Sequence, residues 1–128
     1  MLVGRIERVL EEDGLRISAM TLYELERGLR KLERRAEGRV KRRKWNLFLS
    51  TATVFGLDEP TFQPWVIAAD LHARVATSSP AITISEIDLL ILATAMVHGM
   101  VLLTSDRRLS DGCSTLSLAD HVECVALA

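Results

Sequence analysis

The sequence has little cysteine and no long uninterrupted apolar run. Its two cysteines are too few for a disulfide framework and lack the Cys/His spacing of a zinc site, which favours a reducing, cytoplasmic setting. The most apolar segment, Ile87 to Leu103, is interrupted by Asp88, His98 and Gly99, and it is shorter than the roughly 20 clean apolar residues that span a bilayer. The opening residues alternate apolar and charged positions, unlike a signal peptide. We therefore expect neither export nor a membrane partner.

The motifs of several enzyme classes are also missing. No serine stands in the nucleophile-elbow pattern, and no glycine run resembles a phosphate-binding loop. The histidines lack the spacing of metal ligands, and His98 is expected to bond the last carbonyls of a helix that ends before Gly99. These absences exclude serine hydrolase and P-loop functions.

Charge is distributed unevenly along the chain. The segment from Arg27 to Lys44, here called the basic segment, holds ten Lys or Arg against two Glu, a local balance of +8. Because the net charge of the whole chain is −1, the remainder carries −9. Two interpretations stay open: a solvated helix face, or a surface for a polyanion or an acidic partner.

Strand and helix patterns alternate in the first half of the chain. Leu2 to Leu10 has the spacing of an amphipathic helix, and Leu15 to Met20 alternates like a short strand. Thr21 and Glu24 have capping-box spacing, which predicts that the next helix starts at Thr21. With a break expected at Gly38, the basic segment lies in a helical hairpin over about residues 22–50.

The second half continues this alternation. A strand is expected over Thr51 to Leu57, followed by a helix from about Phe62 to Thr77. The helix that starts at Ser85 is apolar on nearly every face and should be central. Met100 to Thr104 is typical of a parallel strand covered on both faces, and the tail beyond Ser114 is expected to add a short strand. The apolar stripe expected on the helix over 62–77 comprises Trp65, Val66, Ala69, Leu71 and Val75.

These patterns predict the α/β class, as a three-layer α/β/α arrangement with a central, mostly parallel sheet. A length of 128 residues suits one domain, here residues 1–128. Neither internal repeats nor low-complexity segments complicate this interpretation.

Three acids lie where a parallel sheet forms its sites, at the carboxyl ends of strands. Glu24 follows the strand that ends near Met20. Asp106 follows the strand that ends at Thr104, and Asp88 opens the central helix. Carboxylates gathered in one cleft favour a hard divalent cation such as Mg²⁺ or Mn²⁺, and such ions can activate water for phosphodiester cleavage. If the three acids converge, the pattern indicates a metal-dependent nuclease.

Each acid also has a purely structural interpretation. Glu24 and Asp88 stand three residues after Thr21 and Ser85, where an acid serves as a helix cap. Asp106 is compatible with a polar loop residue. Spacing alone leaves both interpretations open.

Three segments resemble the PIN-domain family, particularly the VapC-type toxins of bacterial toxin–antitoxin pairs. They are ISAMTLYELERG (Ile17 to Gly28), EIDLLILATAMVHG (Glu86 to Gly99) and MVLLTSDRRL (Met100 to Leu109), and their order and spacing also match. With the intervening helices, the resemblance covers nearly the whole chain. It implies a PIN-like fold.

The resemblance also implies a function. Glu24, Asp88 and Asp106 correspond to the family's catalytic, metal-binding acids, and Thr104 to a neighbouring hydroxyl residue. The implied activity is cleavage of RNA by a metal-activated water, with Mg²⁺ or Mn²⁺, in a homodimer neutralised by a cognate antitoxin. The basic residues then expected to contact RNA phosphates are Arg27, Arg30, Lys31, Arg34 and Arg35.

One departure concerns the first strand of the family pattern. Family members begin with a central strand ending in an Asp-Thr-Asn-like motif, whereas this chain begins one helix later. Asp13 precedes the strand at Leu15 and so would lie at the opposite edge of the sheet. The hypothesis is that a late-assigned start or a truncation removed this strand. Its loss would leave two neighbouring strands with open edges, which dimerisation or strand exchange could cover.

This departure keeps other functions open. A degenerate PIN-like module would bind nucleic acid or a partner protein without cleavage, because losing one ligand of a shared metal cluster weakens ion binding and misplaces the water. A purely structural α/β domain is the third interpretation. DNA remains an alternative substrate.

Overall fold

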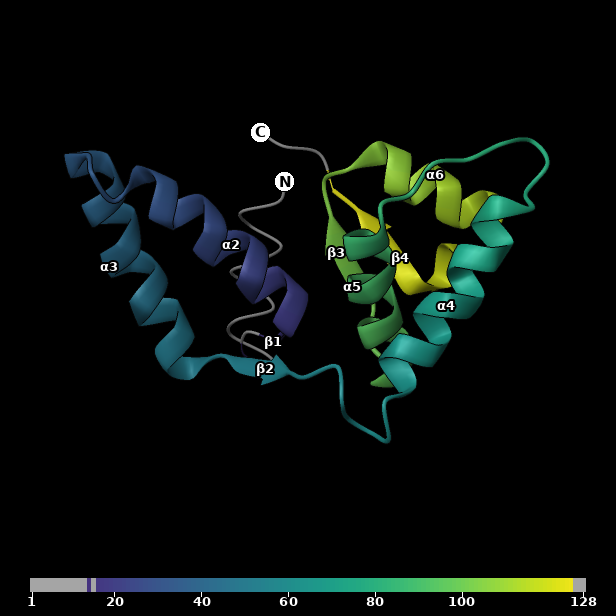
Figure 1. The fold of residues 1–128 in the computed structure, drawn as a ribbon, viewed down its shortest axis with the longest axis horizontal. Coiled ribbons are helices and arrows are strands. Elements are labelled where there is room, and N and C mark those ends of the chain that lie inside the picture. The colour runs from purple at the N-terminus through teal and green to yellow at the C-terminus, as the bar shows by residue number, and fades with distance from the viewer. Residues whose placement is uncertain (1–13, 15, 126–128) are drawn as a thin grey trace.

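The computed structural model describes residue 14 and residues 16–125 (Figure 1). The helix expected over 2–10 lies outside these residues. The helices are α2 (Ala19–Leu32), α3 (Ala36–Thr51), α4 (Gln63–Ala76), α5 (Glu86–Val97) and α6 (Arg107–Thr115), with a 3-10 turn at Ala119–His121. The strands are β1 (Arg16–Ser18), β2 (Thr53–Phe55), β3 (Leu102–Thr104) and β4 (Val122–Cys124). No helix in the described ranges is both long enough and apolar enough to cross a membrane.

The strands are parallel, as expected, but they form two separate sheets. β1 pairs with β2, with Ile17 opposite Val54, and β3 pairs with β4, with Leu103 opposite Glu123. On its other edge neither β1 nor β3 pairs with any described strand. In Figure 1 the β1–β2 sheet lies with α2 and α3, and the β3–β4 sheet lies with α4, α5 and α6. The α/β class is confirmed, whereas the continuous central sheet is not formed by the described residues.

Helix α5 is central, as its all-round apolar sequence predicts. Leu92 and Ala93 are fully buried and Leu89 is almost so. The helix packs most extensively against α4, and it also contacts β1 and β3, which belong to different sheets. It is therefore the element shared by both parts of the fold. The main core cluster comprises Ala68, Leu71, Ile84, Leu89, Leu92, Ala93, Leu109, Cys113, Leu116 and Leu118.

The apolar stripe expected on α4 was correct at Leu71 and Val75 and wrong at its other positions. Leu71 is buried and Val75 packs against the core, whereas Trp65 and Val66 are 48% and 58% exposed. The other buried positions of α4 are Pro64 and Ala68. The face with Ala68 and Leu71 belongs to the main core cluster, and α4 packs against α5. A pattern of apolar spacing does not specify which apolar face of a helix meets its neighbour.

The expected helical hairpin is present, but Gly38 is not its break. α2 ends at Leu32, and α3 starts at Ala36 after a short turn. Gly38 lies inside α3 and is buried. A Cβ at this position would overlap the backbone carbonyl of Leu32 and lie 2.8 Å from the amide nitrogen of Glu33. Glycine is therefore required for the close approach of the two helices rather than for ending one of them.

The two expected helix starts have different outcomes. Ser85 caps α5, and its Oγ accepts a hydrogen bond from the Asp88 amide at 3.1 Å, as expected. The start at Thr21 was wrong, because α2 begins two residues earlier. Ser18 is already extended at the end of β1, and its Oγ accepts from the Met20 amide at 3.1 Å. Thr21 is consequently an ordinary helical residue.

Candidate functional site

Two of the three acids lie on helices as half-buried side chains that have no partner among the described residues. Asp88 is the third residue of α5, and Glu24 lies in the second turn of α2. Neither carboxylate makes a hydrogen bond or an ion pair with another described residue. Partly buried carboxylates are usually paired, so both are candidates for binding something the chain does not itself provide.

Asp106 caps helix α6, a role that its structural interpretation as a polar loop residue did not include. It lies just after β3, and its Oδ1 accepts hydrogen bonds from the amides of Arg108 at 2.9 Å and Leu109 at 3.4 Å. Thr104 Oγ1 accepts from the Asp106 amide at 3.1 Å, so this hydroxyl shapes the turn that places the aspartate. Asp106 also borders a surface depression of about 550 Å³. Its lining residues are Ser105, Asp106, Arg107, Ser110, Asp111, Cys124 and Val125.

The three acids do not form a metal centre in this arrangement. Among the described residues, no group of three or more His, Cys, Asp or Glu is placed to hold a metal ion. The expected convergence required one continuous sheet, with its strand ends side by side. Glu24 instead follows β1 and Asp106 follows β3, and these strands belong to different sheets. The side chains present therefore do not fit a metal ion without a change in how the two sheets sit.

Two contacts tie the β1–β2 sheet to the central helix. Ser18 Oγ lies 3.4 Å from Thr94 Oγ1, and both residues are buried. The ring of His98 stacks on Phe55, with 4.1 Å between the centroids. His98 Nε2 is buried without a hydrogen-bond partner in the described structure, so this atom does not bond the helix carbonyls as expected. Sequence spacing carried no signal for either contact, because the partners lie far apart along the chain.

The basic segment forms an exposed surface on the α2–α3 hairpin. All five residues expected to contact phosphates are exposed, as are four further basic residues on α3. The exception is Arg42, which is half-buried. The five expected residues are Arg27, Arg30, Lys31, Arg34 and Arg35, and the four on α3 are Arg39, Lys41, Arg43 and Lys44.

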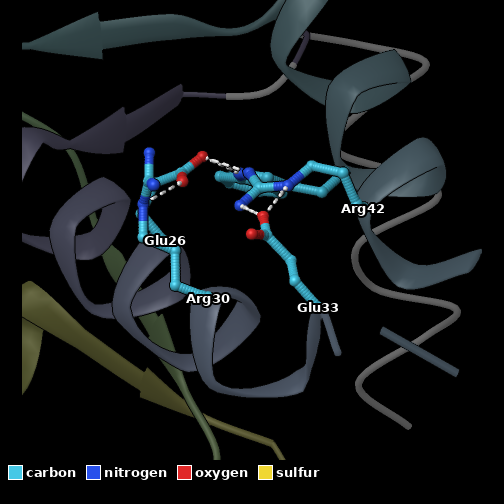
Figure 2. A network of polar contacts seen from close by, with 5 residues as sticks. Glu26, Arg30, Glu33 and Arg42 are labelled. Carbon is cyan, nitrogen blue, oxygen red and sulfur yellow. Dashed lines mark hydrogen bonds and ion pairs between the residues drawn. The ribbon is translucent and has the colours of Figure 1, made fainter. Parts of the chain in front are cut away.

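Arg42 clamps the two helices of the hairpin (Figure 2). Its Nη1 donates to Glu26 Oε1 at 2.6 Å, and its Nη2 donates to Glu33 Oε1 at 2.5 Å. The indole of Trp45 donates to the same Glu26 oxygen at 3.3 Å. The hydrogen bond from Arg42 lowers the pKa of Glu26, and the two glutamates raise the pKa of Arg42. Arg42 is therefore a structural residue within a segment whose other cations are exposed.

Replacing Arg42 with methionine should lower the thermal midpoint at neutral pH. Because the folded state lowers the pKa of Glu26, the clamp stabilises the protein above the unfolded pKa of this group and is lost as the pH falls through the folded value. The difference between wild type and Arg42→Met should accordingly shrink in acid. Circular dichroism melts over a pH series measure it. Arg43→Met, at an exposed neighbouring position, is the charge-matched control, and an equal drop in both variants would rule out the clamp.

Comparisons with known proteins agree with this architecture. The family model of the PIN domain matches residues 2–113, so the chain belongs to the PIN-domain family. A chain of the crystal structure of VapBC2 from Rickettsia felis bound to a DNA fragment from their promoter has a similar fold, with a TM-score of 0.67. The identity is 19%, over 85% of this chain and 76% of that chain. A sequence search of curated proteins found no match.

Family membership confirms the expected fold. PIN domains generally use a divalent metal ion, whereas the likeness to the Rickettsia felis chain, at its low identity, shows a shared fold alone.

Proposed function

We propose that this chain is a PIN-type endoribonuclease of the toxin class, which hydrolyses RNA phosphodiester bonds with Mg²⁺ or Mn²⁺. The observation that carries the proposal is the state of Glu24 and Asp88. Both are half-buried carboxylates without a described partner, on a chain rich in arginine. By contrast, three glutamates of the hairpin are bound by Arg or Lys. These paired glutamates are Glu26, Glu33 and Glu37.

Assembly of the site requires the two sheets to come together. The open edges of β1 and β3 both lie on strands that contact α5. A further extended strand between them would bond to both edges, at the usual spacing of just under about 5 Å between neighbours, and make one sheet. The carboxyl ends of β1 and β3 would then lie at the same edge, with Glu24, Asp88 and Asp106 around one cleft.

In the assembled site the acids, Thr104 and the basic segment have different roles. Glu24, Asp88 and Asp106 are the proposed metal ligands and catalytic acids. Thr104 holds the backbone of Asp106 through the hydrogen bond described above. The exposed cations of the basic segment contact RNA phosphates, which positions RNA without identifying its sequence.

The proposed partners follow from the same class of protein. The structural neighbour is a VapBC2 complex bound to promoter DNA. We propose a cognate antitoxin for this chain, homodimerisation, and action in the cytoplasm. An antitoxin that covers the acids would block the site, and its acidic groups could also meet the basic segment.

Cleavage of a labelled single-stranded RNA tests the proposal. The chain should cut it with Mg²⁺ or Mn²⁺ and not with EDTA, and Asp88→Asn should reduce the rate at least about 100-fold, because a neutral amide holds a divalent cation more weakly than a carboxylate does. Asp70→Asn, at an exposed position on α4, makes the same chemical change away from the site and should keep full activity. Equal activity in Asp88→Asn would show that the cleavage belongs to a contaminant or to another site.

A second candidate is a PIN-fold module that binds RNA without cutting it. The absence of a three-acid group among the described residues favours it. RNA binding without any cleavage, with affinity unchanged by Asp88→Asn, would support this candidate and overturn the nuclease proposal.

A further inference from the structure

We infer that Tyr23 and Arg27 form a platform on which an unpaired base of single-stranded RNA stacks. This inference rests on the proposed function and adds the class of RNA that the surface selects. The relevant features are an exposed aromatic ring, a cation over that ring, a run of basic residues on the same helix face, and a neighbouring candidate catalytic acid.

The ring of Tyr23 is accessible and already paired with a cation. Tyr23, on α2, is 51% exposed, and the guanidinium carbon of Arg27 lies 5.3 Å from the centroid of its ring. The two residues are one helical turn apart, so this contact alone is an ordinary surface pair. Tyrosine and arginine are, however, the side chains on which unstacked bases rest, because both present flat faces to a base.

The helix continues this platform as a basic stripe. Arg30 and Lys31 lie seven and eight positions after Tyr23, on the same helix face as Arg27, and both are exposed. The side chain of Arg30 is 73% exposed despite its long contact with Glu26 at 3.8 Å. A phosphate backbone that follows the stripe would therefore lead to the Tyr23 ring.

The surroundings of the ring favour nucleic acid over a protein partner. An apolar protein helix needs several apolar neighbours on the surface it covers, whereas Glu26 and Arg27, one turn after Tyr23 on α2, are both charged. Glu24 follows Tyr23 directly in the chain, so the ring and a proposed catalytic acid lie on the same turn of α2. In a duplex both faces of each base are already covered, and the ring would have nothing to stack on.

Fluorescence anisotropy with one labelled oligoribonucleotide, single-stranded or annealed to its complement, tests the platform. EDTA is present throughout, so cleavage cannot affect the result. Tyr23→Ala should weaken binding to the single strand roughly 5-fold to 100-fold, and Tyr23→Phe should keep wild-type affinity because it keeps the ring. Binding to the duplex should be unchanged in both variants. Trp65→Ala removes an aromatic of similar exposure on α4 and should have no effect.

Several outcomes would overturn the inference. Unchanged single-strand affinity in Tyr23→Ala would remove the ring from the interface. Equal losses for single strand and duplex would indicate a general effect on the basic surface, and a loss in Tyr23→Phe equal to that in Tyr23→Ala would show that the hydroxyl matters rather than the ring. Circular dichroism spectra of each variant check folding. Because binding is measured without metal, the result can be interpreted in the same way for a chain that never cleaves RNA.

Discussion

Replacing Leu92 with alanine should destabilise the protein by about 2–5 kcal/mol, the range for removing a fully buried leucine from a core. Leu92 has no exposed surface, and it lies on α5 within the main core cluster. Alanine would remove apolar contacts and leave a cavity that the surrounding helices fill only partly. Since domains of this size are stable by only about 5–15 kcal/mol, the loss would be a large share of the total.

Urea denaturation followed by circular dichroism measures this loss. The midpoint should fall while the dependence of the unfolding free energy on urea stays the same, because the surface exposed on unfolding hardly changes. Leu47→Ala on α3 is the matched control, since Leu47 is 73% exposed and its truncation should change stability by less than about 0.5 kcal/mol. A similar small effect in both variants would contradict the central position of α5.

The helices and strands could be predicted largely because their signals are local. The all-round apolar sequence of α5 identified the most buried helix, and β1, β2 and β3 lie within the segments expected for them. The cap at Ser85 could be predicted from the sequence, because the hydroxyl of a residue at a helix start lies close to the backbone amide three residues later. Such features depend on a few neighbouring residues.

What the sequence could not supply depends on contacts between distant segments. The burial of Gly38 follows from the approach of two helices, and the buried face of α4 follows from its packing against α5. Sheet pairing is of the same kind, because an apolar strand pattern specifies no partner. The expected convergence of Glu24, Asp88 and Asp106 assumed that β1 and β3 belong to one sheet. The expectation depended more on this assumption than on the spacing of the three acids in the sequence.

The central claim is that acids from both parts of the fold act as one site, and titration of the protein with Mn²⁺ tests it most directly. Calorimetry would compare wild type with Glu24→Gln, Asp88→Asn and Asp106→Asn, and with Asp70→Asn as the control. If the three acids share an ion, each single substitution should weaken Mn²⁺ binding at least about tenfold, and a double substitution should add less than the sum of the single effects. Mn²⁺ binding that is unchanged in all three variants, or three losses that are small and strictly additive, would contradict the shared site.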